Sequence, residues 1–351
     1  MKVACLAGVV LLLCRAAGAQ ANSYTAAPIV NNTQDSYLIN PWGLSRPASS
    51  GLTENEWWVS DNATGYTTLY YADKTGTQSL APLVIAVPSA SGTGHGSPTG
   101  TAYNAAQGPG PGKENFTFAT LDGTISNWNV GQRPSKAGAG CYQCHVNSAT
   151  VMVNHSSSGA SYTGLTLAQN ATTHAPTYYV ANNKGSVEAY DAASFKPVTL
   201  SGGFSDPRIP SSYKAFGVQA LGSLVVVSFF DGVSGGYVDA FDTNGNLKAR
   251  LANGSFSEPW GIALAPANFG ALSNMVLVAN TASGWISAFN PKTGAFEGFL
   301  NDATGNPITI PGLWAISFGN SNPESGPVNT LYYTGGGTIY TTGVFGAITA
   351  N

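Results

Sequence analysis

The sequence predicts an all-β fold, a single closed ring of six four-stranded blades. Versions of one four-residue phrase recur at six places: Pro41–Leu44, Pro98–Thr101, Tyr162–Leu165, Ala215–Val218, Pro259–Ile262 and Leu313–Ile316. The third residues of successive phrases lie 57, 64, 53, 44 and 54 residues apart. Short apolar runs and turn residues alternate after each phrase. A repeat of this length, built from short strands, is typical of a β-propeller.

The fifth repeat shows the strands of one blade most clearly. Its apolar runs predict four strands, at 261–265, 275–279, 285–289 and 295–300. Asn280–Gly284 and Asn290–Gly294 separate the later strands and are rich in turn-forming residues. Four antiparallel strands joined by tight turns form one propeller blade.

The sixth repeat is one strand short. It offers Trp314–Phe318, Thr330–Thr334 and weak strands before the C-terminus. Tyr24–Val30 can supply the missing edge, and closing a ring with a strand from the other terminus removes exposed edges. We therefore predict one propeller domain over residues 22–351. A seven-bladed ring is the alternative, because the 57- and 64-residue spacings leave room for extra strands.

Three segments carry a resemblance to a known type of protein: Asn40–Leu44, Glu258–Gly270 and Gly312–Asn320. Their Pro-x-Gly-Ile openings, and the strands ending in Asp or Asn, resemble NHL-type (TolB-like) six-bladed propellers. They are most similar to an uncharacterised family of secreted proteins of this type. The resemblance covers nearly all of residues 22–351 and implies the fold but no activity. The third and fourth repeats lack the proline, and Ala315 replaces glycine in the sixth, so these repeats depart from the pattern at the blade boundaries.

The N-terminus has the outline of a signal peptide. Lys2 supplies a positive start, Val3–Cys14 is a short apolar run, and small residues follow in a cleavage-site pattern. We predict a signal peptide over residues 1–21 and an exported protein, secreted or periplasmic, from which it has been removed. No later run reaches about 18 apolar residues, so no membrane span is predicted.

Composition narrows the classes of partner. Charged residues make up 9% of the chain, against roughly 25% in an average domain, and the net charge is -3 without a basic cluster. Nucleic acid and anionic membranes are therefore excluded as expected partners. No Gly-x-Ser-x-Gly motif, phosphate loop or paired carboxylates stand out. The sequence favours a binding module for a small polar molecule, a glycan or a protein over an enzyme.

Six Asn-x-Ser/Thr sequons are candidate glycosylation sites in a eukaryotic secretory pathway. They are Asn31, Asn62, Asn115, Asn154, Asn170 and Asn253. The alternative is that a chain rich in Asn, Ser and Thr forms sequons by chance.

The repeat also predicts where a ligand would bind. The start of each first strand and the end of each second strand meet at the top face of a propeller, near its axis. This top rim should carry Asn40, Trp42, Asp61, Asn182, Asp231, Trp260, Asn280 and Trp314. Flat aromatic rings beside amides suit a sugar or another flat polar ligand. The favoured alternative for the three tryptophans is packing between blades.

A calcium site at the same face is a second hypothesis. Glu258, Asp61, Asn40 and Asn280 would supply carboxylate and amide oxygens, the ligands that Ca²⁺ prefers. Such a site resembles the metal centre of gluconolactonase-like propellers and would make the protein a hydrolase or lactonase. The alternative is that these side chains cap turns at strand ends.

Cys141, Cys144 and His145 form a C-x-x-C-H motif, the attachment signature of haem c. It lies in a Gly- and Ala-rich insertion, residues 130–150, predicted as a bottom-face loop between the third and fourth strands of blade two. That segment has few apolar residues to build a haem pocket. A local disulfide or free thiols are therefore favoured over haem, and zinc lacks an obvious fourth ligand.

Overall fold

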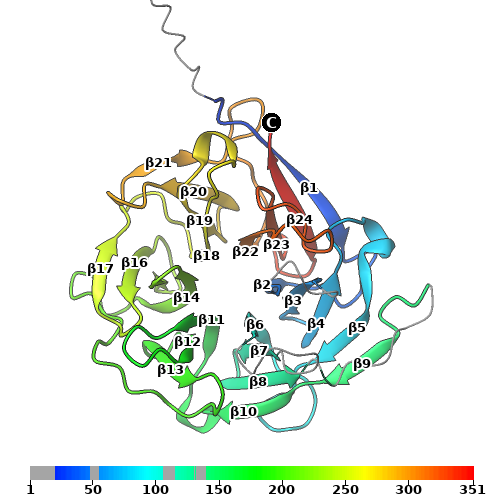
Figure 1. The fold of residues 1–351 in the computed structure, drawn as a ribbon, viewed down its shortest axis with the longest axis vertical. Helices are drawn as coiled ribbons and strands as arrows, with labels where there is room; N and C mark the ends of the chain where they lie inside the picture. The colour runs from blue at the N-terminus through cyan, green and yellow to red at the C-terminus, as the bar shows by residue number, and fades with distance from the viewer. Residues whose placement is uncertain (1–19, 48–54, 106–114, 130, 132–139) are drawn as a thin grey trace, which may run out of the picture.

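The computed structural model is a six-bladed β-propeller, with the blades arranged in order around one axis (Figure 1). It describes residues 20–47, 55–105, 115–129, 131 and 140–351. Most of the predicted signal peptide and much of the 130–150 insertion therefore lie outside the described residues.

The strands form six sheets, numbered here as blades from the first repeat phrase. Blade 1 contains β2 (Pro41–Ser45), β3 (Trp57–Asp61), β4 (Tyr66–Tyr70), β5 (Leu80–Ala86) and β9 (His145–Ser148). Blade 2 contains β6 (Pro98–Asn104), β7 (Asn115–Thr120), β8 (Thr124–Asn129) and β10 (Thr150–Asn154). Blade 3 contains β11 (Tyr162–Gln169), β12 (Pro176–Asn182) and β13 (Val187–Asp191). Blade 4 contains β14 (Lys214–Leu221), β15 (Leu224–Phe230), β16 (Tyr237–Asp242) and β17 (Leu247–Arg250). Blade 5 contains β18 (Pro259–Leu264), β19 (Val276–Asn280), β20 (Trp285–Phe289) and β21 (Phe296–Phe299). Blade 6 contains β22 (Leu313–Phe318), β23 (Leu331–Gly335), β24 (Val344–Ala350) and β1 (Tyr24–Asn31). Short 3₁₀ turns occur at Gly76–Ser79, Ser156–Ser158 and Gly270–Leu272.

Each repeat phrase forms the start of an innermost strand. The ladder between the first and second strands shifts register within all six phrases, as in β2 between Pro41 and Leu44 and in β18 between Pro259 and Ile262. Such a bulge bends the strand and re-aims its side chains. The repeated phrase therefore encodes a β-bulge in the innermost strand of each blade.

The glycine of the phrase is explained by how closely the inner strands approach. A Cβ added at Gly43 would collide with the carbonyl oxygen of Thr99 on the next blade, and one at Gly261 with that of Trp314. A side chain at this position would push neighbouring blades apart, so glycine recurs there.

The predicted ring closure is confirmed. β1 pairs antiparallel with β24, which places a strand from the N-terminus at the outer edge of the C-terminal blade (Figure 1). Tyr24 anchors this strand, because its buried hydroxyl donates to Phe269 O at 2.9 Å and accepts from Leu272 N at 2.9 Å.

Two blades depart from four strands. Blade 3 has three, and the chain after β13 makes only the single bridge Tyr190–Pro197 before β14 begins, among the residues described. Blade 1 has five, because β9 pairs in parallel with β5, with Leu83 opposite His145 (Figure 1). The end of the predicted loop insertion is thus a strand on the outer edge of blade 1. The prediction of a loop was therefore wrong for residues 145–148, because these residues pair with a strand of the neighbouring blade.

Aromatic and aliphatic side chains fill the space between adjacent blades. Trp58 of blade 1 stacks on Phe116 of blade 2 with ring centroids 3.7 Å apart, for example. No helix in the described part of the chain is both long and apolar enough to cross a membrane.

Candidate functional site

The centre of the ring holds an aromatic plug, formed by Trp42, Phe216, Trp260 and Trp314. All four occupy the second position of their repeat phrases, and all are buried. Trp42 stacks on Trp314 at 3.7 Å between centroids, and Trp260 meets both edge-on. Blades 2 and 3 carry the small Thr99 and Thr163 at the same position, which leaves room for these rings.

Two of the three tryptophans donate their indole N–H to a hydrogen-bond acceptor inside the protein. Trp260 Nε1 donates to Thr163 O at 2.8 Å across the ring, and Trp314 Nε1 donates to Asn40 Oδ1 at 3.0 Å. Trp42 Nε1 is buried and has no hydrogen-bond partner among the described residues. The three tryptophans are therefore packed between blades, which was the predicted alternative to an exposed platform. Their rings fill the predicted mouth of the channel.

The polar residues of the predicted top rim separate into different surroundings. Asp61 lies inside blade 1, where it accepts a hydrogen bond from Thr68 at 2.8 Å. Burial, and then the nearby Asp35, hold the pKa of Asp61 well above its usual range. Asp231 accepts the backbone N–H groups of Val233 and Ser234 in its own turn, as the capping alternative expects, whereas Asn280 accepts from Ser257 N, just before β18.

The calcium site stays a prediction, and two of its predicted ligands already use their side-chain oxygens within the protein: Asn40 Oδ1 accepts from Trp314 Nε1, and Asn280 Oδ1 accepts from Ser257 N. Among the described residues, the one group of three His, Cys, Asp or Glu ligand atoms within 4.8 Å is Cys141, Cys144 and His145. Glu258 and Asp61 are in no such group. Glu258 lies half-buried near Tyr340, and burial raises its pKa to about 7.

The sequons differ in exposure. Asn62, Asn115 and Asn170 are buried, and the amides of Asn62 and Asn170 donate to backbone carbonyls at 3.1 Å. Asn154 and Asn253 are exposed and Asn31 is half-buried. A glycan on the folded chain is therefore compatible only with these last three.

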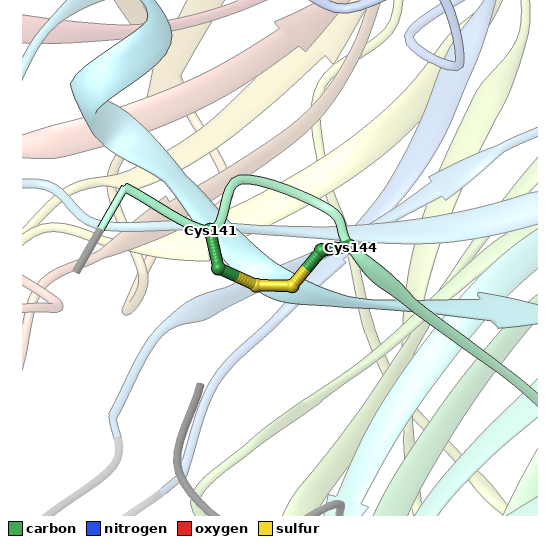
Figure 2. The surroundings of a disulfide bond; sticks show 2 residues. All are labelled: Cys141 and Cys144. Atoms are coloured by element: carbon green, nitrogen blue, oxygen red, sulfur yellow. A yellow bond between two sulfur atoms is a disulfide. The ribbon is translucent and has the colours of Figure 1, made fainter. Parts of the chain in front are cut away.

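The Cys141 and Cys144 side chains are joined in a disulfide, shown in Figure 2, with the Cα atoms 5.5 Å apart. In this form neither sulfur is available for a thioether to haem. The turn is docked on blade 1, because Gln143 N donates to Ala81 O at 3.0 Å and the Gln143 amide donates to Asp35.

A pocket that sequence reasoning missed lies in blade 3, where the fourth strand is absent. This blade-3 pocket has a volume of about 270 Å³. Its polar end is formed by His155, Glu188 and Tyr190, and its apolar wall includes Val198, Leu200 and Phe204.

Four segments position the polar end of the pocket. Glu188 and Tyr190 alternate along β13, so they lie on one face of that strand. Tyr162 begins β11, and His155 lies between β10 and the following 3₁₀ turn. Asn182, predicted at the rim, ends β12 and is hydrogen-bonded to Glu188 of this group.

Glu188 is the centre of the hydrogen-bond network. Its Oε1 accepts from Asn182 at 2.7 Å, and its Oε2 accepts from Tyr162 at 2.7 Å and from Tyr190. Burial raises the pKa of Glu188, but the three hydrogen bonds outweigh burial and the net pKa lies below its ordinary value. Burial, with the adjacent carboxylate, raises the pKa of both tyrosines. At neutral pH the pocket therefore holds a carboxylate and two neutral phenols.

His155 completes the polar end. Its Nδ1 lies 2.9 Å from the Tyr162 hydroxyl and 3.6 Å from Glu188 Oε2. Because the hydroxyl hydrogens of both tyrosines are directed to Glu188, Nδ1 is the donor to the tyrosine oxygen. The other ring nitrogen, Nε2, remains for a ligand, and the side chain is 42% exposed.

Comparison with known proteins adds distant relatives. No family model matches the chain. It is 25% identical over 340 residues to Uncharacterized protein L690 of Acanthamoeba polyphaga mimivirus, a match that covers 90% of this chain and 81% of that protein. It is also 25% identical over 258 residues to Uncharacterized protein R640 of the same virus, covering 68% of this chain. The match spans 44% of R640, less than half of its length.

A solved structure supports the fold class. The "PQQ-bound form of Aldose Sugar Dehydrogenase (Adh) from Streptomyces coelicolor" superposes with a TM-score of 0.55 over 95% of this chain and 100% of that chain, at 12% identity. At this low sequence identity, the similarity shows a shared fold and nothing about activity. The chain is therefore a six-bladed β-propeller with distant, uncharacterised viral relatives.

Proposed function

We propose that this protein is a binding propeller for a small polar molecule, and that the ligand binds in the blade-3 pocket. The sequence predicts the binding role at the channel mouth, but the aromatic plug fills that position. The blade-3 pocket lies along β13, at the open outer edge of the blade, and a charged carboxylate lines it.

One observation carries the proposal: a carboxylate and an imidazole converge on an open cavity. Glu188 stays ionised through three donated hydrogen bonds, and His155 presents Nε2 beside it. Arg and Lys are absent from the residues that line the cavity, so hydrogen bonds and the nearby His155 ring offset the charge of Glu188. A ligand that brings a hydroxyl or an ammonium group would complete this end.

The size and wall of the pocket define the ligand further. Its volume of about 270 Å³ is equivalent to roughly nine waters at ~30 Å³ each and lies just below the usual range for ligand pockets. Leu200 and Phe204 also line the pocket and add apolar surface to it. We therefore propose a ligand of monosaccharide or amino-acid size with one polar, donor-bearing end and an apolar face.

A ligand-observed NMR screen of monosaccharides, amino acids and short amines against the full chain tests the proposal. We expect a ligand whose signal is lost in Glu188→Gln and weakened at least about tenfold in His155→Gln, because each removes a contact at the polar end. Val198→Phe, which fills the cavity, should also abolish binding.

Glu297→Gln is the matched control, since Glu297 is an exposed glutamate on β21 in another blade. It should bind as the unmodified protein does. Binding that survives Glu188→Gln and Val198→Phe would contradict the site, and a screen without any ligand would contradict the function.

We also propose that the protein is exported with residues 1–21 removed and that the repeat is of the NHL type. A Cys141–Cys144 disulfide supports export, because such bonds persist in oxidising compartments. N-terminal sequencing of the protein from its native host tests it: a mature chain that begins at Met1 would contradict export by this route.

A further inference from the structure

The C-x-x-C-H turn holds three potential metal ligands that the proposed function does not use. The sulfur atoms of Cys141 and Cys144 and a ring nitrogen of His145 lie within 4.8 Å of one another. Cys144 is exposed and the other two are half-buried, so solvent reaches the group. Two thiolates and an imidazole form a ligand set that Zn²⁺ favours.

The turn is held in place by contacts other than the disulfide. Gln143, in the left-handed region at φ 50, donates its backbone N–H to Ala81 O at 3.0 Å. Its side-chain amide donates to the buried Asp35, which also accepts from Tyr70 at 2.6 Å. His145 begins β9 and is registered with Leu83 of β5. Opening the disulfide would therefore leave the three ligands close to each other.

We propose that this turn is a redox-gated zinc site. Two external thiols reduce the Cys141–Cys144 disulfide, supply two electrons and two protons, and are themselves joined as a disulfide. Zn²⁺ then binds both cysteine sulfurs and His145, with release of the two thiol protons. Water occupies the fourth position, which matches a three-ligand site open to solvent. In the oxidised protein the sulfurs are bonded to each other and the site cannot form.

The full chain, oxidised or reduced with a phosphine, is dialysed against Zn²⁺ and analysed by native mass spectrometry. We expect one zinc ion in the reduced protein and none in the oxidised protein. With Co²⁺ as a spectroscopic probe, the reduced protein should show thiolate-to-metal charge transfer, which identifies sulfur ligands.

Variants separate the site from adventitious binding. Cys141→Ser/Cys144→Ser should bind no zinc even under reducing conditions, and His145→Gln should weaken zinc binding at least about tenfold. Gln143→Ala keeps all three ligands but removes the side-chain anchor, and we expect a loss of roughly 10- to 100-fold in affinity. His174→Asn, at an exposed loop histidine, is the matched control and should bind as the unmodified protein does.

The proposal is overturned if the reduced, folded protein with two titratable thiols binds no zinc. Zinc retained by Cys141→Ser/Cys144→Ser also overturns it, because other ligands would then hold the ion. Circular dichroism of each variant establishes that the propeller is folded. The result is independent of binding in the blade-3 pocket, which uses other residues.

Discussion

Glu258 and Asn40 show how single residues adapt the repeat. Both precede a Pro-Trp-Gly phrase and lie in the left-handed region, at φ 60 and φ 48, where blade 6 has Gly312 at φ 64. The backbone oxygens of all three accept an N–H from the end of the second strand, from Thr281, Asn62 and Gly336 respectively. The conformation is therefore part of the repeat, and Asn tolerates it better than Glu.

Replacement of Glu258 by glutamine should change the pH dependence of stability. The folded pKa of about 7 lies above the ordinary value of 4.5, so the native state binds more protons than the unfolded state between these values. The folded protein therefore loses stability as pH rises from about 4.5 through 7. Because Glu258 is partly exposed, we expect Glu258→Gln to be more stable by only about 1 kcal/mol at pH 8.

Denaturant unfolding of both proteins at pH 5 and pH 8 measures this difference. At pH 5 the two should be nearly equal, since Glu258 is then largely protonated when folded. An equal difference at both pH values would show that titration of Glu258 is not the cause.

The tryptophans of the plug predict unequal responses to the same substitution. Trp260→Phe leaves Thr163 O without its 2.8 Å donor, whereas Trp42→Phe removes an N–H that has no partner among the described residues. Both lose ring area, but we expect Trp260→Phe to destabilise by about 1 kcal/mol more. Urea denaturation measures the two free energies of unfolding, and a larger loss for Trp42→Phe would contradict the assignment.

At the scale of elements, strands that depend on distant partners are the ones that define this ring. β1 pairs with β24 across almost the whole chain. β9 pairs with β5 rather than with its neighbours in sequence. The edge of blade 3 stays open and leaves the cavity beside β13.

Tyr24→Phe should weaken the closure of the ring. The change removes the hydroxyl that links β1 to Phe269 O and Leu272 N and leaves two buried backbone groups unpaired. We expect a loss of about 1–3 kcal/mol and faster hydrogen exchange in β1 and β24, measured by mass spectrometry. Tyr142→Phe, at a 46% exposed tyrosine, is the control and should be nearly neutral.

Part of the element pattern was predictable and part was not. The third strand of blade 5, Trp285–Phe289, was predicted with its observed bounds, and β1 was predicted because blade 6 lacked an edge. β9 was missed because a Gly- and Ala-rich segment carries no strand signal of its own. The blade-3 pocket was missed because His155 and Glu188 are 33 positions apart and meet only through the packing of blades 2 and 3.

At the scale of the whole molecule, the radius of the ring depends on the inner strands. The glycine of the repeat phrase lies against the backbone of the next blade, and a Cβ at Gly217 or Gly261 would collide with a carbonyl oxygen there. Blade 6 has Ala315 at this position, so its repeat phrase is the one that carries a Cβ there. The contact from blade 6 to blade 1 therefore accommodates a methyl group, whereas the contacts at Gly217 and Gly261 do not.

Gly261→Ala and Ala315→Gly form a matched pair at equivalent positions. Gly261→Ala forces two blades apart, and we expect it to destabilise the ring by about 2–3 kcal/mol. Ala315→Gly should cost about 0.5–1 kcal/mol, chiefly through chain entropy. Thermal unfolding measures both, and equal losses would mean that the approach of the strands does not limit the position.

The sequence by itself determined the six blades, because each carries its own bulge phrase and its own alternation of apolar runs and turns. It also determined the closing strand, since one blade lacked an edge and one strand lacked a partner. Only the tertiary structure decided that the tryptophans turn inward to fill the axis, that β9 crosses to blade 1, and that Glu188 and His155 share a cavity. These features depend on contacts between blades, and local sequence patterns do not encode which way a side chain faces in a closed ring.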